Sequence, residues 1–165
     1  MKNIQERLTP YQIRLEAERQ LPDKGRCCID TALRLSGLTE QLPQLYQDGT
    51  IPYWDRKLWP RPDTVYGLVL QHLPELSQPR KGAIVAWTRP LAGSSFPWVS
   101  HMAIVRNPSP LLVTDRRGNN GLLLEDAPAE EAELICAAPN SKQRYFAPLP
   151  GYISQIKKGL DAVRR

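Results

Sequence analysis

The spacing of apolar residues changes near Pro79, and this change limits the fold more than any other feature of the 165-residue chain. Before it, apolar residues recur every three or four positions, as at Leu8, Tyr11 and Leu15, which is typical of amphipathic helices. After it, short apolar runs separated by turn residues predict strands. Helices followed by strands predict an α+β fold in which N-terminal helices pack on an antiparallel sheet.

The same periodicities predict where the helices and strands lie. Helices are expected at about 4–20, 27–36, 38–48 and 63–73, and strands at 83–87, 99–105, 111–114, 122–124, 132–137 and 143–146. Pro10 lies inside the first helix and predicts a kink or a break there. We expect one domain, 1–165, with a core at about 25–146, an N-terminal helix at 3–20 and a C-terminal helix at 151–163.

Composition and charge restrict the kind of partner. Lys and Arg number 22 against 17 Asp and Glu, which gives a net charge of +5, and most of the excess is spread along the chain. The sequence has no arginine-rich run with interleaved aromatic residues, so no nucleic-acid partner is expected. No apolar run reaches the ~20 residues of a membrane-spanning helix, so no membrane span is expected. A modest positive field is compatible with an anionic polymer such as a cell wall.

The first residues are polar and lack the apolar centre of a secretory signal. We therefore expect a protein that is cytoplasmic, that is delivered to the periplasm by a dedicated secretion system, or whose signal was removed. Sixteen prolines favour short, interrupted elements. Three cysteines form neither a disulfide framework nor a zinc-binding spacing, so we expect at least one free thiol and no metal or other cofactor.

Two adjacent cysteines open the helix predicted at 27–36. A thiolate is the nucleophilic form of cysteine, and the unpaired N–H groups and positive dipole end of a helix N-terminus favour it. Cys28 would lie about one turn before Ala32, on the face that packs against the protein, which makes it the candidate nucleophile. Both cysteines are also compatible with small core residues, and Cys136, in a weaker predicted strand, is interpreted as a core residue.

His101 lies in the run 99–105, where alternation places it on one face with Ala103. An imidazole can serve as the base for a thiol, and a third polar group usually orients it. We expect that group on the next strand, and Asp115 is the best candidate because a carboxylate accepts the Nδ1–H and favours the imidazolium. The alternatives are Thr114, Asn119, Asn120 and Asp126. A histidine that serves only sheet packing is the competing interpretation, and His72 is assigned to the surface or to helix packing.

Four segments, in order, resemble an uncharacterised bacterial family of papain-like proteins related to the NlpC-type and CHAP cell-wall peptidases. The first is similar to the family's Gly-x-Cys-x-Asp-x-x-x-Arg pattern, with Cys28, Asp30 and Arg34 at matching positions and Gly25 one residue further out. The others are 61–64, 81–87 and 100–105, of which the last two resemble Gly-Asp-Ile-Val-x-Trp and His-x-Gly-Ile-Val strands.

The chain departs from this pattern at three places. Ala83 stands where the family has Asp, and Ala103 stands where it has Gly. Thr114 and Asp115 occupy the strand position where a polar His or Asn is expected, which leaves the third catalytic residue open.

The resemblance implies a papain-like fold in which Cys28 and His101 form a catalytic dyad, and Asp30 two residues later favours Cys28 over Cys27. It implies a cysteine peptidase or amidase that cleaves an amide bond, with peptidoglycan peptides as the expected substrate. For a secreted antibacterial toxin, an inhibitory or immunity protein is the expected partner. Candidates for lining the substrate groove are Tyr53, Trp54, Trp59 and Trp98. The alternatives are a non-catalytic papain-like binding or adaptor module, and an acyl transferase or deamidase that uses the same dyad.

Overall fold

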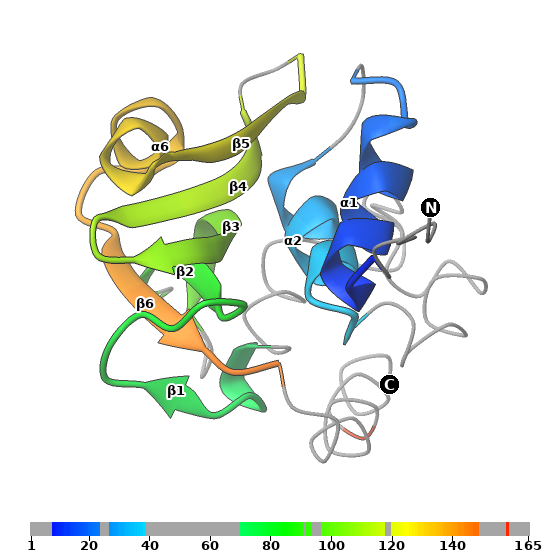
Figure 1. Ribbon diagram of the computed structural model, residues 1–165. Helices are drawn as coiled ribbons and strands as arrows, with labels where there is room; N and C mark the ends of the chain where they lie inside the picture. Colours follow the sequence, from blue (N-terminus) through cyan, green and yellow to red (C-terminus); the bar gives the residue numbers. More distant parts are fainter. Residues whose placement is uncertain are drawn as a thin grey trace, which may run out of the picture.

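The computed structural model describes residues 8–23, 27–38, 70–90, 92–93, 97–117, 120–148 and 158. The α+β prediction is confirmed, because in this part of the chain three helices accompany a six-stranded antiparallel sheet (Figure 1). Most of the segments predicted at 38–48 and 151–163, and residues 63–69 of the helix predicted after them, lie outside the described residues.

Helix α1 spans Pro10–Arg19 and begins at the proline that was expected to interrupt it. Proline suits the first helical position, where the missing N–H has no intrahelical partner. Thr9 caps the helix: its Oγ1 accepts the Gln12 N–H at 3.2 Å, and Gln12 Oε1 accepts the Thr9 N–H at 2.7 Å. The helix described within the predicted segment 4–20 thus begins at Pro10, where the sequence predicted a kink or a break, and the capping box sets this start.

The sheet has the strand order β1-β6-β2-β3-β4-β5, and all neighbouring strands are antiparallel. Its strands are β1 Glu75–Leu76, β2 Ile84–Arg89, β3 Trp98–Pro108, β4 Leu111–Arg117, β5 Leu122–Pro128 and β6 Lys142–Phe146. The predicted strands at 83–87 and 99–105 correspond to β2 and β3. The two-residue strand β1 had no sequence prediction, because so short a segment carries no periodic signal.

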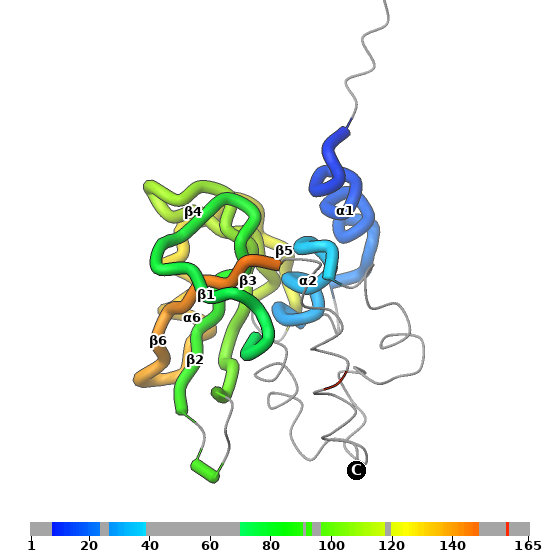
Figure 2. The backbone as a smooth tube through the Cα atoms, turned by 90° about the horizontal axis from the view of Figure 1, so that it is seen from below, coloured from blue at the N-terminus to red at the C-terminus, as the bar shows by residue number. Residues whose placement is uncertain are grey.

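The two faces of the sheet carry separate cores. On one face, Met102 and Ile104 of β3 pack with the apolar residues of α2, which spans Cys28–Leu35. On the other face, Ala103 and Val105 pack with the buried alanines of α6. Figure 2 shows α1 and α2 on one side of the strands and α6 on the other. Because side chains alternate along a strand, neighbouring residues of β3 face different helices.

Helix α6 spans Ala129–Cys136, where the sequence predicted a strand at 132–137, so that prediction is wrong. Glu130 and Glu131 lie in its first turn, where the helix dipole favours acidic residues. Alanine, glutamate and leucine dominate the segment and are good helix formers. The consecutive apolar residues near its end resemble a short strand, although two of them, Leu134 and Ile135, are exposed.

Candidate active site

The structure brings His101 and Asp115 into direct contact. His101 lies on β3 and Asp115 on the adjacent strand β4, and the distance between Nε2 and Oδ2 is 2.7 Å. The two residues are 2% and 0% exposed, so water does not compete for this hydrogen bond. Arg117 Nε lies 3.0 Å from Asp115 Oδ2 and 3.1 Å from Oδ1, which fixes the carboxylate from its other side. The imidazole is thus held in one orientation.

Burial and two neighbouring residues determine the charge of His101. Burial disfavours the imidazolium, but hydrogen bonds with Asp115 and Cys136 outweigh burial and raise the pKa of His101 from 6.5 to about 9. At neutral pH the ring is therefore protonated. An imidazolium beside a thiol stabilises the thiolate, which is the nucleophilic form of cysteine.

Cys136 is the thiol that the structure places beside His101, as the last residue of α6. Its side chain is partly exposed, so it is not the core residue that the sequence indicated. On the same helix, Glu133 accepts the Trp87 Nε1–H at 3.3 Å, and this bond ties α6 to β2. A helical interpretation of 129–136 would have found Cys136, because it lies seven residues after Ala129 on the face that meets the sheet.

Cys28 begins α2, as predicted, and Cys27 is the N-cap residue, whose Sγ accepts the Ile29 N–H at 3.4 Å. The Cys28 thiol contacts the Cys27 thiol and accepts a hydrogen bond from the backbone of Met102. The hydrogen bond with Cys27 and burial raise the pKa of the Cys28 thiol well above its ordinary value. In this conformation the N-terminal position of Cys28 on α2 does not produce a thiolate.

Cys28 and His101 lie on opposite faces of β3. Cys28 packs against the core beneath α2, which includes Met102. The His101 ring lies 5.4 Å from the Trp87 ring, centroid to centroid, and Trp87 belongs to the core beneath α6. Figure 1 shows these two helices on opposite sides of the strands. The structure therefore does not join Cys28 to the His101–Asp115 pair.

The alternative third residues lie elsewhere. Thr114 Oγ1 accepts the Asp126 N–H at 3.2 Å, and the Asp126 carboxylate lies 3.5 Å from Arg106 Nε. Asn120 is an exposed turn residue, and Asn119 lies outside the described residues. Among the candidates in the described part of the chain, Asp115 is the one that contacts His101.

Other residues of the resemblance have structural partners or lie outside the described ranges. Arg34 pairs with Glu18 of α1 at 2.8 Å and so joins α1 to α2. Trp98 lies beneath Arg89, 4.2 Å from the guanidinium carbon to the ring centroid. The residues outside the described ranges are Gly25, Tyr53, Trp54, Trp59 and segment 61–64.

No family model, curated protein or solved structure matches the chain. Within the described residues, no group of three or more His, Cys, Asp and Glu side chains is arranged to hold a metal ion. None of the helices in the described ranges has the length and apolar content that crossing a membrane requires.

Proposed function

We propose that the protein is a cysteine-dependent amide hydrolase of the papain-like class, in which His101 is the acid–base group and Asp115 orients it. The observation that carries the proposal is the buried 2.7 Å contact between His101 Nε2 and Asp115 Oδ2. Because Asp115 occupies Nε2, the other ring nitrogen, Nδ1, is left to exchange a proton with a thiol.

The proposed reaction has two steps. A cysteine sulfur attacks the carbonyl carbon of the amide, its proton having passed to His101, and the imidazolium then protonates the leaving amine. Water, deprotonated by His101, hydrolyses the resulting thioester and frees the sulfur. General acid–base help of this kind contributes about 10²–10⁴-fold to the rate. A peptide amide, including those of peptidoglycan, is the substrate class that the family resemblance favours.

Two thiols are candidates for the nucleophile, each supported by a different observation. Cys28 has the family-like sequence pattern and the first position of α2. Cys136 has the hydrogen bond with His101. Reaction at Cys28 would require the His101 side chain to point to the opposite face of the sheet, which α2 covers. The register of β2 and β3 is irregular between Trp87 and Thr88, and His101 is paired with Trp87 at this point. A one-residue change of the register there would turn the His101 side chain to the opposite face of the sheet.

The test is site-resolved labelling of the full chain with a limiting amount of a thiol-reactive probe at neutral and mildly acidic pH, followed by peptide mapping. We expect fast labelling at one of the two candidates, lost in His101→Ala and reduced in Asp115→Asn. The labelled position identifies the nucleophile, and the Cys28→Ala or Cys136→Ala variant then abolishes hydrolysis of peptidoglycan fragments. His72→Ala, at the other histidine of the chain, is the matched control for His101→Ala. Slow, uniform labelling that does not depend on His101 would contradict the proposal.

The second candidate function is a non-catalytic binding or adaptor module, and the burial of the site favours it. His101, Asp115 and Arg117 are all at least nine-tenths buried and bonded to one another, as in an ion network that only stabilises a fold. In that case His101→Ala would lower stability without changing the labelling rate of any cysteine in the folded protein.

A further inference from the structure

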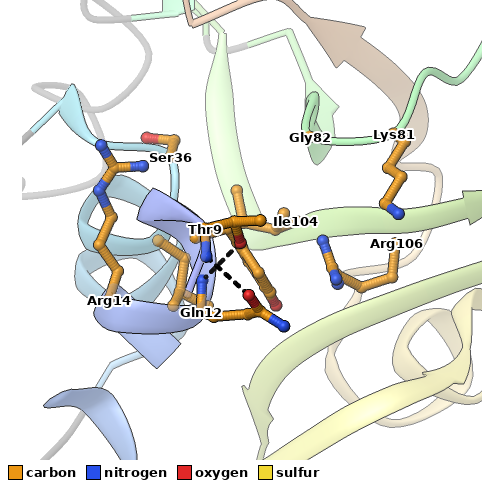
Figure 3. Close-up of a pocket in the computed structure, with 10 residues that line it drawn as sticks. Thr9, Gln12, Arg14, Ser36, Lys81, Gly82, Ile104 and Arg106 are labelled. Carbon is orange, nitrogen blue, oxygen red and sulfur yellow. Dashed lines mark hydrogen bonds between the residues drawn. The ribbon is translucent and has the colours of Figure 1, made fainter. Parts of the chain in front are cut away.

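We propose that a pocket between α1, the end of α2 and β3 binds a small molecule through a carboxylate or phosphate group. This inference does not depend on the proposed hydrolase. The pocket has a volume of about 400 Å³, and ten of the described residues line it (Figure 3). Such a volume lies within the usual range of small-molecule sites. The pocket meets α2 at Leu35 and Ser36, at the opposite end of the helix from Cys28.

The charged side chains that the described residues contribute to the lining are all positive. They are Arg14, Lys81 and Arg106, and no aspartate or glutamate of the described part of the chain lines the pocket. Figure 3 shows Lys81 and Arg106 together on one side of the pocket and Arg14 on the other, beside Ser36. Lys81 and Arg106 lie side by side and repel one another, and a bound anion would remove this repulsion.

Arg106 is held in place before any ligand binds. Its guanidinium carbon lies 3.6 Å from the centroid of the Tyr11 ring, and Tyr11 also lines the pocket. Arg106 Nε pairs with the Asp126 carboxylate at 3.5 Å, and the Asp126 side chain is 63% exposed. Such an exposed pair contributes little and leaves most N–H groups of the guanidinium to a ligand. Lys81 is exposed and has no ion pair within the part of the chain that is described.

The hydrogen-bonding groups of the wall also favour an acceptor-rich ligand. The acceptors at the start of α1, Thr9 Oγ1 and Gln12 Oε1, are both used by the capping box. The donors that the lining offers to a ligand include N–H groups of Gln12, Lys81 and Arg106. Leu35 and Ile104 supply an apolar surface beside the charged groups. A ligand with one anionic group on a small apolar body matches both the cationic and the apolar surface of the pocket.

The test compares two probes of matched shape, phenyl phosphate and benzoate, titrated into the full chain at constant ionic strength and followed by NMR chemical shifts. We expect saturable shifts at Tyr11, Ile104 and Arg106 with at least one probe, and the stronger probe identifies the anionic group. Arg106→Gln should weaken binding at least about tenfold, because it removes charged hydrogen bonds. Lys81→Gln should weaken it about threefold and, at an exposed position, should leave folding unchanged.

Arg80→Gln is the matched control, since Arg80 is the exposed neighbour of Lys81 and does not line the pocket. It changes the net charge equally and should leave the affinity unaltered. If Arg80→Gln weakens binding as much as Lys81→Gln does, the effect is that of a diffuse positive field and the pocket is not the site. Absence of saturable binding by both probes would also overturn the proposal.

Discussion

At the scale of the residue, His101 combines features that are seldom found together in a purely structural histidine. It is 2% exposed, its Nε2 is bonded to Asp115, and a thiol also contacts its ring. Desolvation alone would keep such a ring neutral. Its two partners reverse that preference, and the result is a buried imidazolium at neutral pH. A charge kept inside a protein in this way is a common feature of reactive sites.

The titration of His101 can be measured directly. We expect its imidazole resonances to titrate near pH 9, because the hydrogen bonds with Asp115 and Cys136 outweigh burial. In Asp115→Asn the carboxylate is gone and burial remains, so the pKa should fall to about the ordinary 6.5 or below. A His72→Gln variant assigns the signals, since the chain has two histidines. An unchanged His101 pKa in Asp115→Asn would show that Asp115 does not control the ring.

The sequence predicted one partner of His101 and missed the other, for physical reasons. Asp115 was accessible to prediction, because strand order and alternation restrict which residues of the next strand can face His101. Cys136 was not, since its position depends on whether 129–136 is a helix or a strand. The apolar residues Leu134 and Ile135 favoured a strand, and they are exposed on the helix that forms. Alternation placed His101 on one face with Ala103, as the structure has it, but the sequence did not predict that α6 covers this face.

At the scale of the element, one buried carboxylate joins two helices to the sheet. Glu18 of α1 is 1% exposed and accepts hydrogen bonds from Thr31 at 2.6 Å and Arg34 at 2.8 and 2.9 Å, both on α2. Arg116 of β4 adds its Nε at 2.9 Å and is itself 2% exposed. The family-like arginine of the cysteine helix therefore has a structural role here.

Glu18→Gln should destabilise the protein by about 3–5 kcal/mol, because it removes the buried carboxylate that pairs with Arg34 and Arg116. Arg116 then keeps only the half-exposed carboxylate of Asp23, at 2.8 Å, among the described residues. Glu16→Gln is the matched control on the same helix: Glu16 is exposed and pairs with Arg19, and its loss should change stability by less than about 1 kcal/mol. Urea unfolding of the two variants measures the difference. Equal, small effects would mean that the Glu18 network contributes no net stability.

The close approach of α6 to the sheet depends on small side chains. Ala129 and Ala132 are 3% and 0% exposed and pack against β-strand residues such as Val113. Ala132→Leu should cost about 1–3 kcal/mol by overpacking and should move Cys136 away from His101. Leu134→Ala, at an 86% exposed position, should change stability by less than about 0.5 kcal/mol. Thermal unfolding measures the loss of stability, and the His101 titration reports whether Cys136 has moved. An unaltered His101 titration in a destabilised Ala132→Leu variant would contradict the predicted movement of Cys136.

At the scale of the whole molecule, the sheet divides the charged groups into two sets. The Glu18 network joins α1 and α2 to the sheet, and the His101 ring lies against Trp87 in the core beneath α6. Figure 2 shows α1 and α2 on one side of the strands and α6 on the other. The sequence predicted N-terminal helices packed on an antiparallel sheet, because helical and strand periodicities occupy separate halves of the chain, but it did not predict α6 on the other face. It did not predict this division, since pairing over nearly a hundred residues, as between Glu18 and Arg116, leaves no local signal.

Because the two networks lie on different faces, we predict that the loss of stability at acid pH comes from the network beneath α1 and α2. The loss of stability at alkaline pH is predicted to come from the network beneath α6. Burial raises the pKa of Glu18, but hydrogen bonds with Arg34 and Thr31 outweigh it and lower the pKa from 4.5 to about 2. The contribution of Glu18 to the free energy of unfolding is therefore complete above pH 4.5 and is lost as the pH falls toward 2. The pKa of His101 is raised from 6.5 to about 9, so its contribution is complete below pH 6.5 and is lost as the pH rises toward 9.

Stability should therefore be greatest between about pH 4.5 and 6.5 and fall on both sides, by at most about 3 kcal/mol for each group. Glu18→Gln should flatten the acid side alone, because it removes the group that must be protonated there. Asp115→Asn should flatten the alkaline side alone, because it removes the carboxylate that keeps His101 charged. Urea unfolding of the three proteins from pH 2 to 9 measures these slopes. If either variant changed both sides, the two networks would be coupled through the sheet rather than separated by it.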